Sequence, residues 1–214
     1  MVKETDPATT GAPVSSRGAI LDAARVLVTS RGYDGMSISD LTARSGLPAS
    51  SIYYHFGNKL GVLAALLERT FDELHAAFPN PSSYDGHEPL ERFEKWVTAA
   101  CASLDERPEY LRILLAISVG PHKDAESVLT TVRRIRAYAR ASWVEALTPV
   151  LAPDGKEADA ALVDRIAVLG QAMIDGLAVT NSFDGAAYSA QVGGIVALVR
   201  GLAEQRGRGP AHVS

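Results

Sequence analysis

The chain has 214 residues, of which 47% are hydrophobic and 21% are charged, and its formal net charge is -4. This composition is typical of a soluble globular protein, and the single cysteine excludes an internal disulfide framework. No apolar run approaches the ~20 residues that a membrane span needs, and the N-terminal residues contain no apolar core of a signal peptide, so we expect a cytoplasmic protein.

A first helix is predicted after a short polar arm. Residues 1–14, MVKETDPATTGAPV, are rich in Thr, Pro and Ala, and we predict that they are disordered. A helix is then predicted from Ser15 or Ser16 to Arg31, because apolar residues recur at helical spacing and a glycine follows the last basic residue. Its apolar side is expected to complete a three-helix head with the two helices that follow.

The segment from Ser37 to Lys59, SISDLTARSGLPASSIYYHFGNK, is typical of a helix, a tight turn, a second helix and the start of a third. Ser37 can accept a hydrogen bond from a first-turn amide, with Asp40 as its capping-box partner. Gly46 is expected to end that helix, because glycine takes the left-handed conformation that a sharp turn requires, and Pro48 suits the next first turn. The spacing predicts a helix-turn-helix.

The second of these helices has one apolar side and one polar side. Leu47, Ile52 and Phe56 form the apolar side. The other side presents small residues, phenols and an imidazole, namely Ala49, Ser50, Ser51, Tyr53, Tyr54 and His55. Small residues allow close approach to the bases, and the longer side chains can reach base edges and phosphates, so this face suits the major groove of DNA. The alternative is a solvent-exposed aromatic patch with no role in DNA binding.

Three motifs in this region resemble the tetracycline-repressor (TetR) family of bacterial transcriptional regulators. They are GYDGMSISDL from Gly32, SGLPASSIYYHF from Ser45 and NKLGVL from Asn58. The similarity covers Arg17 to about Glu68, which is under a third of the chain. It implies a DNA-binding head joined to a helical domain for an effector and for dimerisation.

The family's DNA contacts can be carried onto matching positions of this sequence. The resemblance implies that DNA is contacted by Ser37, Ser39, Pro48, Ala49, Ser50, Ser51, Tyr53, Tyr54, His55 and Lys59. Three positions depart from the usual family pattern. Thr42 and Ser45 stand where alanine is common, and Leu60 stands where an acidic residue is common.

The charge distribution is compatible with a nucleic-acid partner. Residues 1–60 contain six basic and five acidic side chains and therefore sum to +1, which leaves -5 for the remainder. This slight asymmetry favours an N-terminal part that faces DNA.

Every later segment is also predicted to be helical, so the fold class is all-α. A long helix runs from Asn58 to Pro79, and the loop PNPSSYDGHEP follows it. Further helices are predicted at 89–106, 108–119, 124–151, 158–181 and 187–205, without the alternation typical of strands. We therefore predict an N-terminal three-helix helix-turn-helix DNA-binding head (15–60), a C-terminal helical ligand-binding and dimerisation domain (61–205) and a disordered tail (206–214).

The last two predicted helices are apolar over more than one face. Such helices must bury their second face, and a second copy of the chain is the simplest partner. The resemblance implies a four-helix dimer interface here, and a dimer suits a palindromic site because it places two reading helices about one DNA turn apart. The predicted interface residues are Leu162, Ile166, Leu169, Met173, Leu177, Val192, Ile195, Val196, Val199 and Leu202.

The resemblance also implies a mostly apolar pocket in the second domain that accepts a small effector. Aromatic side chains with a polar group are suitable lining for such a pocket. The candidates are Trp96, Tyr110, Leu114, Ser118, Tyr138, Trp143 and Met173. Alternatively, the aromatic residues form a filled core. The arginines of the 124–151 helix (Arg133, Arg134, Arg136 and Arg140) are predicted to form a solvated face rather than a ligand site.

No motif indicates an enzyme. The five histidines have no metal-site spacing along a helix, and Cys101 lies in an apolar helix with no histidine within its own turns, which predicts a buried and inert thiol. The sequence contains no Gly-rich phosphate loop, Gly-x-Ser-x-Gly elbow or Ser-Lys dyad motif. We therefore expect no catalytic residues, no metal and no cofactor.

The sequence thus predicts a homodimeric transcriptional repressor that a small apolar or aromatic effector releases from a palindromic double-stranded DNA operator. Repression is the output that the resemblance implies. The alternative is a helix-turn-helix scaffold with a filled second domain, no small-molecule effector, and regulation by a protein partner. A cavity large enough for a ligand separates these two hypotheses.

Overall fold

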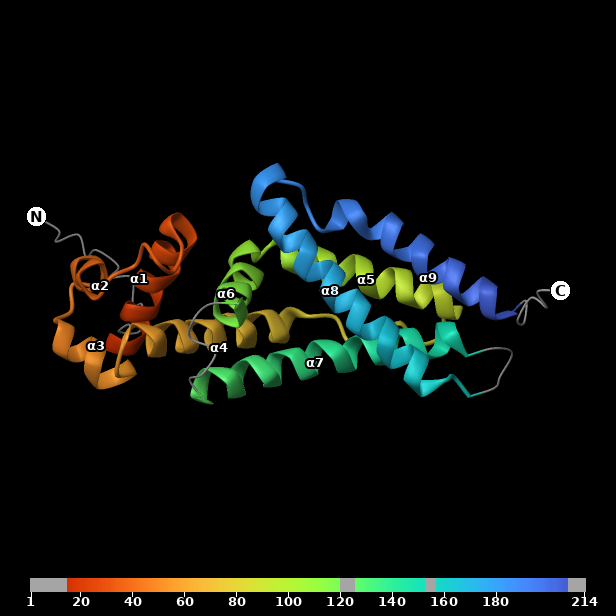
Figure 1. The fold of residues 1–214 in the computed structure, drawn as a ribbon, viewed down its shortest axis with the longest axis horizontal. Helices are drawn as coiled ribbons and strands as arrows, with labels where there is room; N and C mark the ends of the chain where they lie inside the picture. The colour runs from red at the N-terminus through yellow and green to blue at the C-terminus, as the bar shows by residue number, and fades with distance from the viewer. Residues whose placement is uncertain (1–14, 120–125, 153–156, 208–214) are drawn as a thin grey trace, which may run out of the picture. The chain divides into compact units, whose positions relative to one another are not determined.

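The computed structural model describes residues 15–119, 126–152 and 157–207 (Figure 1). These residues contain helices and no strand, so the predicted all-α fold is confirmed. The helices are α1 (Ser16–Arg31), α2 (Ile38–Ser45), α3 (Ala49–Phe56), α4 (Lys59–Ala77), the 3-10 helix η1 (Pro81–Tyr84), α5 (Pro89–Asp105), α6 (Pro108–Val119), α7 (Glu126–Leu151), α8 (Ala160–Asp184), the 3-10 helix η2 (Ser189–Gln191) and α9 (Val192–Gly207).

Two of the predicted segments fall largely outside the described residues. The arm predicted at 1–14 lies outside them completely, and so does the tail predicted at 206–214 except for its first two residues, which belong to α9. The chain divides into two compact units, Met1–Leu66 and Leu67–Ser214. The division falls inside α4, so this one helix contributes residues to both units.

The first unit is a small bundle in which α1, α2 and α3 pack against one another. Its core is formed by apolar side chains that are at most 1% exposed, among them Ile20, Leu21, Met36, Leu41, Ile52, Val62 and Leu63. Gly46 adopts φ 71° between α2 and α3, so the left-handed turn predicted there is confirmed. Asn58 caps α4, since its side-chain oxygen accepts a hydrogen bond from the Gly61 amide at 2.9 Å.

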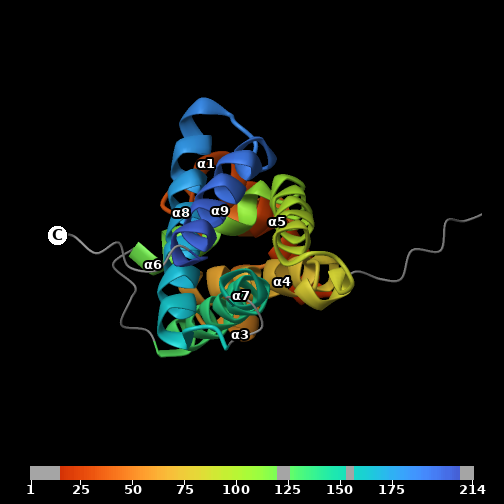
Figure 2. The same ribbon diagram turned by 90° about the vertical axis from the view of Figure 1, so that its right-hand side faces the viewer.

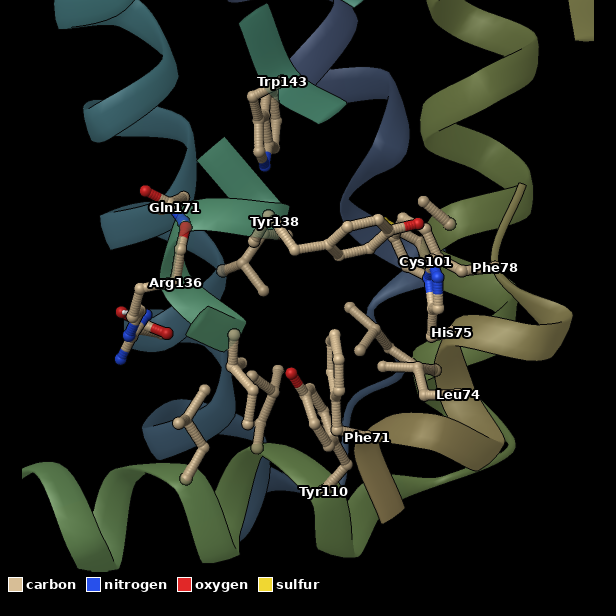
Figure 3. Close-up of a pocket in the computed structure, with 18 of the residues that line it drawn as sticks. Phe71, Leu74, His75, Phe78, Cys101, Tyr110, Arg136, Tyr138, Trp143 and Gln171 are labelled. Carbon is tan, nitrogen blue, oxygen red and sulfur yellow. Dashed lines mark hydrogen bonds and ion pairs between the residues drawn. The ribbon is translucent and has the colours of Figure 1, made fainter. Parts of the chain in front are cut away.

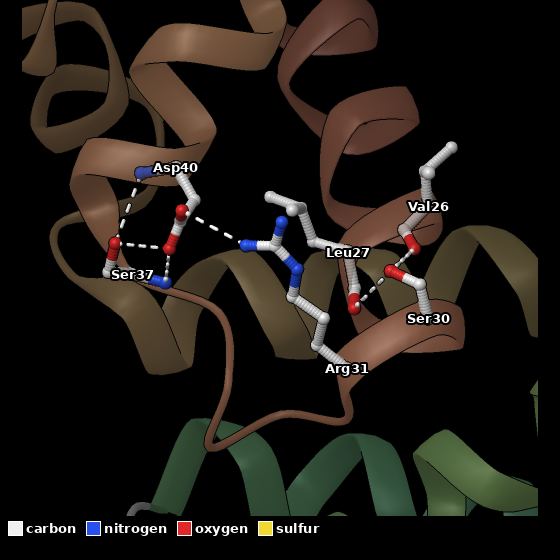
Figure 4. A network of polar contacts seen from close by, with 6 residues as sticks. All are labelled: Val26, Leu27, Ser30, Arg31, Ser37 and Asp40. Atoms are coloured by element: carbon white, nitrogen blue, oxygen red, sulfur yellow. Dashed lines mark hydrogen bonds and ion pairs between the residues drawn. The ribbon is translucent and has the colours of Figure 1, made fainter.

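A polar network fixes the start of α2 against the end of α1 (Figure 4). The Asp40 amide donates to Ser37 Oγ, and the Ser37 amide donates to Asp40 Oδ2, both at 3.0 Å, which forms the predicted capping box. Arg31 Nη1 then donates to Asp40 Oδ1 at 3.3 Å. The hydrogen bonds from Ser37, followed by the charge of Arg31, hold the pKa of Asp40 below its ordinary value.

The second unit consists of the later part of α4 and the helices from α5 to α9 (Figure 2). Helix α7 packs along α8 and against α5, while α9 packs on α5 and α7. The side chains of Phe93, Trp96, Val97, Ile113 and Leu147 are at most 1% exposed and form its core. Asp105 at the end of α5 accepts hydrogen bonds from the Tyr188 and Ser189 amides. These bonds hold the segment that precedes α9 against α5.

The loop predicted after α4 is partly helical and partly buried. It contains η1, and Pro81 in this helix is buried. Arg92 Nε of α5 donates to the Pro81 carbonyl at 3.2 Å, and Trp96 Nε1 donates to the Pro79 carbonyl at 3.1 Å. The prolines lack amides to donate, but their carbonyls are free to accept, so α5 holds this loop in place.

Loss of the capping box is expected to destabilise the first unit. We expect Ser37→Ala to lower the free energy of unfolding by about 1 kcal/mol near neutral pH, as for other N-cap deletions. Because the folded pKa of Asp40 is lowered, its contribution is present above the ordinary carboxyl pKa and is lost as the pH falls through the folded pKa. Urea denaturation followed by circular dichroism should therefore show Asp40→Asn differing from the wild type most near neutral pH.

The matched control is Asp72→Asn, which removes an exposed carboxylate from α4 at a position that caps no helix. Its stability difference should be small at every pH. An Asp40→Asn difference that grew on acidification would contradict the role of the charged carboxylate in the capping box.

Candidate functional site

Helix α3 directs its polar face to solvent. Ile52 is fully buried in the first unit, whereas Tyr54 is 86% exposed and Tyr53 is 53% exposed. The rings of Tyr54 and His55 meet edge to face with their centroids 5.1 Å apart. A large aromatic side chain that is exposed to this degree does not stabilise the core, so this face is available to a partner.

The ten DNA-contact candidates all lie in the first unit, on α3 and its flanks. Exposed among them are Ser37, Ser39, Pro48, Ser50, Tyr53, Tyr54 and His55, and half-buried are Ala49, Ser51 and Lys59. The hydroxyl of Ser37 is engaged in the capping box. Pro48 is the N-cap residue of α3 and makes no side-chain cap hydrogen bond.

Lys59 is placed by residues that the sequence analysis did not single out. Its ammonium nitrogen lies 4.1 Å from the ring centroid of Tyr33 and donates to the Asp34 carbonyl at 3.5 Å. A cation over an aromatic face is electrostatically favourable. The guanidinium of Arg17 similarly lies 5.5 Å from the ring centroid of Phe56. Tyr33 lies within the GYDGMS motif, so its position beside the motif lysine could have been considered from the sequence.

The second unit contains an apolar cavity with an empty volume of about 720 Å³, which includes the part that opens to solvent (Figure 3). Helices α4 to α8 all contribute to its walls. The lining residues are Phe71, Leu74, His75, Phe78, Trp96, Val97, Ala100, Cys101, Leu104, Tyr110, Leu111, Leu114, Ile135, Arg136, Tyr138, Ala139, Trp143, Gln171, Ile174 and Asp175. A lining of apolar and aromatic side chains with a few polar groups is typical of a site for a small organic molecule.

The structure brings together most of the predicted pocket residues. Trp96, Tyr110, Leu114, Tyr138 and Trp143 line the cavity. Ser118 and Met173 do not. The hydroxyl of Ser118 donates to the Leu114 carbonyl of its own helix at 2.7 Å, and Met173 lies on the side of α8 that borders a groove beside α9. The apolar pattern of α6 and α8 could not show which of their sides faces the cavity.

Polar side chains of α7 and α8 form part of the cavity wall. Arg136 Nη1 pairs with Asp175 Oδ2 at 2.6 Å, and Gln171 Nε2 donates to the Arg136 carbonyl at 2.9 Å. The solvated face predicted for the α7 arginines is therefore wrong for Arg136, which is half-buried and lines the cavity. Sequence reasoning missed this pair because its two members are 39 residues apart.

Two further cavity groups are a histidine and the single cysteine. The ring of His75 stacks on Phe71 with centroids 5.6 Å apart and meets Tyr138 edge to face at 4.3 Å. Cys101 is buried, as the sequence indicates, and burial raises the pKa of its thiol to about 11. The thiol is therefore protonated near neutral pH and is a poor nucleophile.

The last two helices expose a broad apolar face. Leu169, Val179 and Phe183 of α8 and Leu198 of α9 are each more than half exposed. Grooves between these helices are lined by Leu169, Met173, Leu198 and their neighbours. Patches of this kind mark interaction surfaces.

Three of the residues predicted at a dimer interface are placed differently. Ile195, Val196 and Val199 are at most 4% exposed, because α9 packs on α5 and α7 of its own chain. Leu169 is exposed, and half-buried are Leu162, Ile166, Met173, Leu177, Val192 and Leu202. The apolar pattern of α9 thus combines core positions with surface positions.

Neither a membrane span nor a metal site occurs in the part of the chain that the structure describes. Within residues 15–119, 126–152 and 157–207, every helix is too short or too polar to cross a membrane. The same residues contain no cluster of three or more His, Cys, Asp or Glu side chains that could hold a metal ion.

Comparison with known proteins gives a family match to the region around α3. Residues 20–66 match the family model described as bacterial regulatory proteins, tetR family. The HTH-type transcriptional repressor KstR of Rhodococcus jostii (strain RHA1) is 25% identical over 138 residues, which are 64% of this chain and 64% of KstR. The chain therefore matches less than two thirds of the length of this relative.

Solved structures share the fold of most of the chain. The ketosteroid transcriptional regulator KstR2 of Mycobacterium tuberculosis has a TM-score of 0.57 and 21% identity, and the match covers 87% of this chain and 94% of KstR2. The transcriptional regulator FadR from Bacillus subtilis, crystallised in complex with stearoyl-CoA, has a TM-score of 0.60 and 14% identity, with 86% and 97% covered. At these identities the likeness shows the fold alone.

Proposed function

We propose that this chain, which belongs to the TetR family of bacterial transcriptional regulators, represses transcription as a homodimer on a palindromic operator until a small apolar effector releases it. The coarser class, a DNA-binding transcriptional regulator, follows from the family match and from the repressor relative. The finer proposal depends on one observation. The chain combines the exposed polar face of α3 with an apolar, aromatic-lined cavity in its second unit.

The proposed DNA contact is made by α3 in the major groove. Its small residues Ala49 and Ser50 would allow the helix to approach the bases, and Tyr54 would reach a phosphate or a base edge. The capped start of α4 would direct backbone amides and Lys59 towards the phosphate backbone. Binding of this kind depends on charge neutralisation and should weaken as the salt concentration rises.

The cavity supports an effector-responsive regulator over a scaffold with a filled second domain. Its wall combines a largely apolar, aromatic lining with a few polar side chains, as ligand pockets do. Helix α4 begins at Lys59 and also supplies Phe71, Leu74 and His75 to the cavity wall. A ligand that displaces this wall would move the same helix that carries Lys59. Its effect on DNA affinity cannot exceed its preference for the DNA-incompetent conformation.

The apolar face of α8 and α9 supports the dimer. An isolated chain would leave Leu169, Phe183 and Leu198 in water, and an identical face on a second copy can cover them in a two-fold arrangement. Two copies would present two α3 helices to the two half-sites of one operator.

Removal of the Tyr54 ring is expected to weaken operator binding without affecting the fold. Tyr54 is 86% exposed, so Tyr54→Ala should leave the circular dichroism spectrum and the thermal midpoint unchanged. Affinity for the upstream intergenic DNA, measured by fluorescence anisotropy, should fall by about tenfold or more, as expected for loss of a base or phosphate contact. The control is Val26→Ala on α1, which removes exposed apolar surface outside α3. Unchanged affinity in Tyr54→Ala would contradict the proposed interface.

A charge on the exposed face of α9 is expected to separate the dimer. Leu198 is 61% exposed, so Leu198→Asp should fold as a monomer in sedimentation velocity and lose tight operator binding. Ile195 is only 2% exposed, so a charge placed there would disturb folding rather than the dimer alone. Ala102→Asp, at an exposed position of α5, is the matched control and should remain dimeric. A Leu198→Asp protein that dimerises and binds DNA normally would exclude this face as the interface.

A further inference from the structure

Two hydrogen-bond donors in the cavity wall have no protein partner. Trp143 is 7% exposed and Tyr110 is 5% exposed, and neither the indole N–H nor the phenol O–H is bonded to any residue of the described chain. Figure 3 shows the indole nitrogen of Trp143 and the phenol oxygen of Tyr110 directed into the cavity from opposite sides. Because both donors face the cavity, they indicate where a ligand would supply acceptors.

The other tryptophan of the wall lacks this property, and Tyr138 is half-buried rather than buried. The indole N–H of Trp96 donates to the Pro79 carbonyl at 3.1 Å, so Trp96 presents only its apolar ring to the cavity. Burial raises the pKa of Tyr110, so its phenol keeps its proton at neutral pH and remains a donor. Besides the polar side chains of α7 and α8 and the ring of His75, the wall therefore offers two buried donors, Trp143 Nε1–H and Tyr110 O–H.

The position of Trp143 is fixed by a close approach of α8. A β-carbon at Gly170 would lie 2.8 Å from two atoms of the Trp143 ring, a distance that real side chains do not adopt. Only glycine at this position allows the backbone of α8 to pack on the indole. Any larger residue would shift the ring and with it the direction of the N–H.

The charges in the wall disfavour an acidic ligand. Besides His75, the acidic and basic side chains of the wall are Arg136 and Asp175, which pair with each other at 2.6 Å. Arg136 is further restrained by the hydrogen bond from Gln171 to its carbonyl. A carboxylate in this cavity would lose its water and would find the guanidinium of Arg136 already paired with Asp175. A neutral ligand avoids this cost.

We infer that the effector is an uncharged, ring-containing apolar molecule with a carbonyl or hydroxyl oxygen at each end, one accepting from Trp143 Nε1–H and the other bonded to Tyr110 O–H. Rings are favoured over a flexible chain because the wall presents the aromatic faces of Phe71, Trp96 and Tyr138. The inference rests on the proposed function, in which this cavity holds the effector.

The test compares neutral and acidic members of matched pairs. The pairs are progesterone and its analogue with a carboxylate in place of the acetyl group, acetylnaphthalene and naphthoic acid, and hexadecanol and palmitate. Affinities for the full-length protein are measured by isothermal titration calorimetry. We expect the neutral member to bind about tenfold or more tightly than the acid in each pair that binds, and progesterone to bind best because it carries an oxygen at each end.

The outcomes separate the two levels of the argument. Tighter binding of an acid, or tightest binding of the straight-chain pair, would overturn the inferred ligand class and leave an effector site in place. Failure of every compound to bind would overturn the proposed effector response, and the ligand class with it.

Charge and donor variants test the named residues. Asp175→Asn leaves Arg136 unpaired and should shift the binding preference towards the carboxylate member of each pair by about tenfold. The control is Asp164→Asn, which breaks the Arg140–Asp164 pair between the same two helices outside the cavity. It should leave the preference unchanged. Trp143→Phe and Tyr110→Phe should each weaken the binding of progesterone by about threefold to tenfold. Neither should change the affinity for its oxygen-free parent hydrocarbon. Equal losses for both compounds would show that these side chains only shape the cavity.

Discussion

The backbone of α8 packs closely on α7 at Gly170, where it meets the indole ring of Trp143. Trp143 lines the internal cavity and also borders the groove between α8 and α9. One side chain therefore separates the proposed effector site from the proposed dimer surface. Because packed interiors have few alternative arrangements, a ligand that shifts this ring would alter the proposed dimer surface.

The polar groups of the second unit are arranged around this packing. The pair between Arg136 and Asp175 and the hydrogen bond from Gln171 join α7 to α8 along one side of the cavity. Glu68 of α4 pairs with Arg134 of α7 at 2.9 Å, so the cavity walls are connected by ion pairs as well as by apolar contacts. Such contacts can be exchanged at modest cost, which suits the two conformations that the proposed effector response requires.

The sequence predicted the first unit well because its signals are local. Ser37 and Asp40 form the cap that their spacing indicates, and Gly46 takes the expected left-handed turn. The cavity was less predictable, since helical periodicity identifies apolar sides but not the side that faces a void. Ser118 and Met173 show this limit. Arg136 shows a second limit of sequence analysis, because its partner Asp175 is distant in sequence and only the folded chain brings the two together.

The central claim is that occupation of the cavity lowers affinity for the operator. Both tryptophans of the chain, Trp96 and Trp143, line the cavity, so intrinsic fluorescence reports its occupation. The most direct measurement titrates progesterone into the complex with labelled upstream DNA and records tryptophan fluorescence and DNA anisotropy together. The account predicts that DNA is released over the same concentration range in which the fluorescence changes. A saturated cavity with operator affinity unchanged would contradict it.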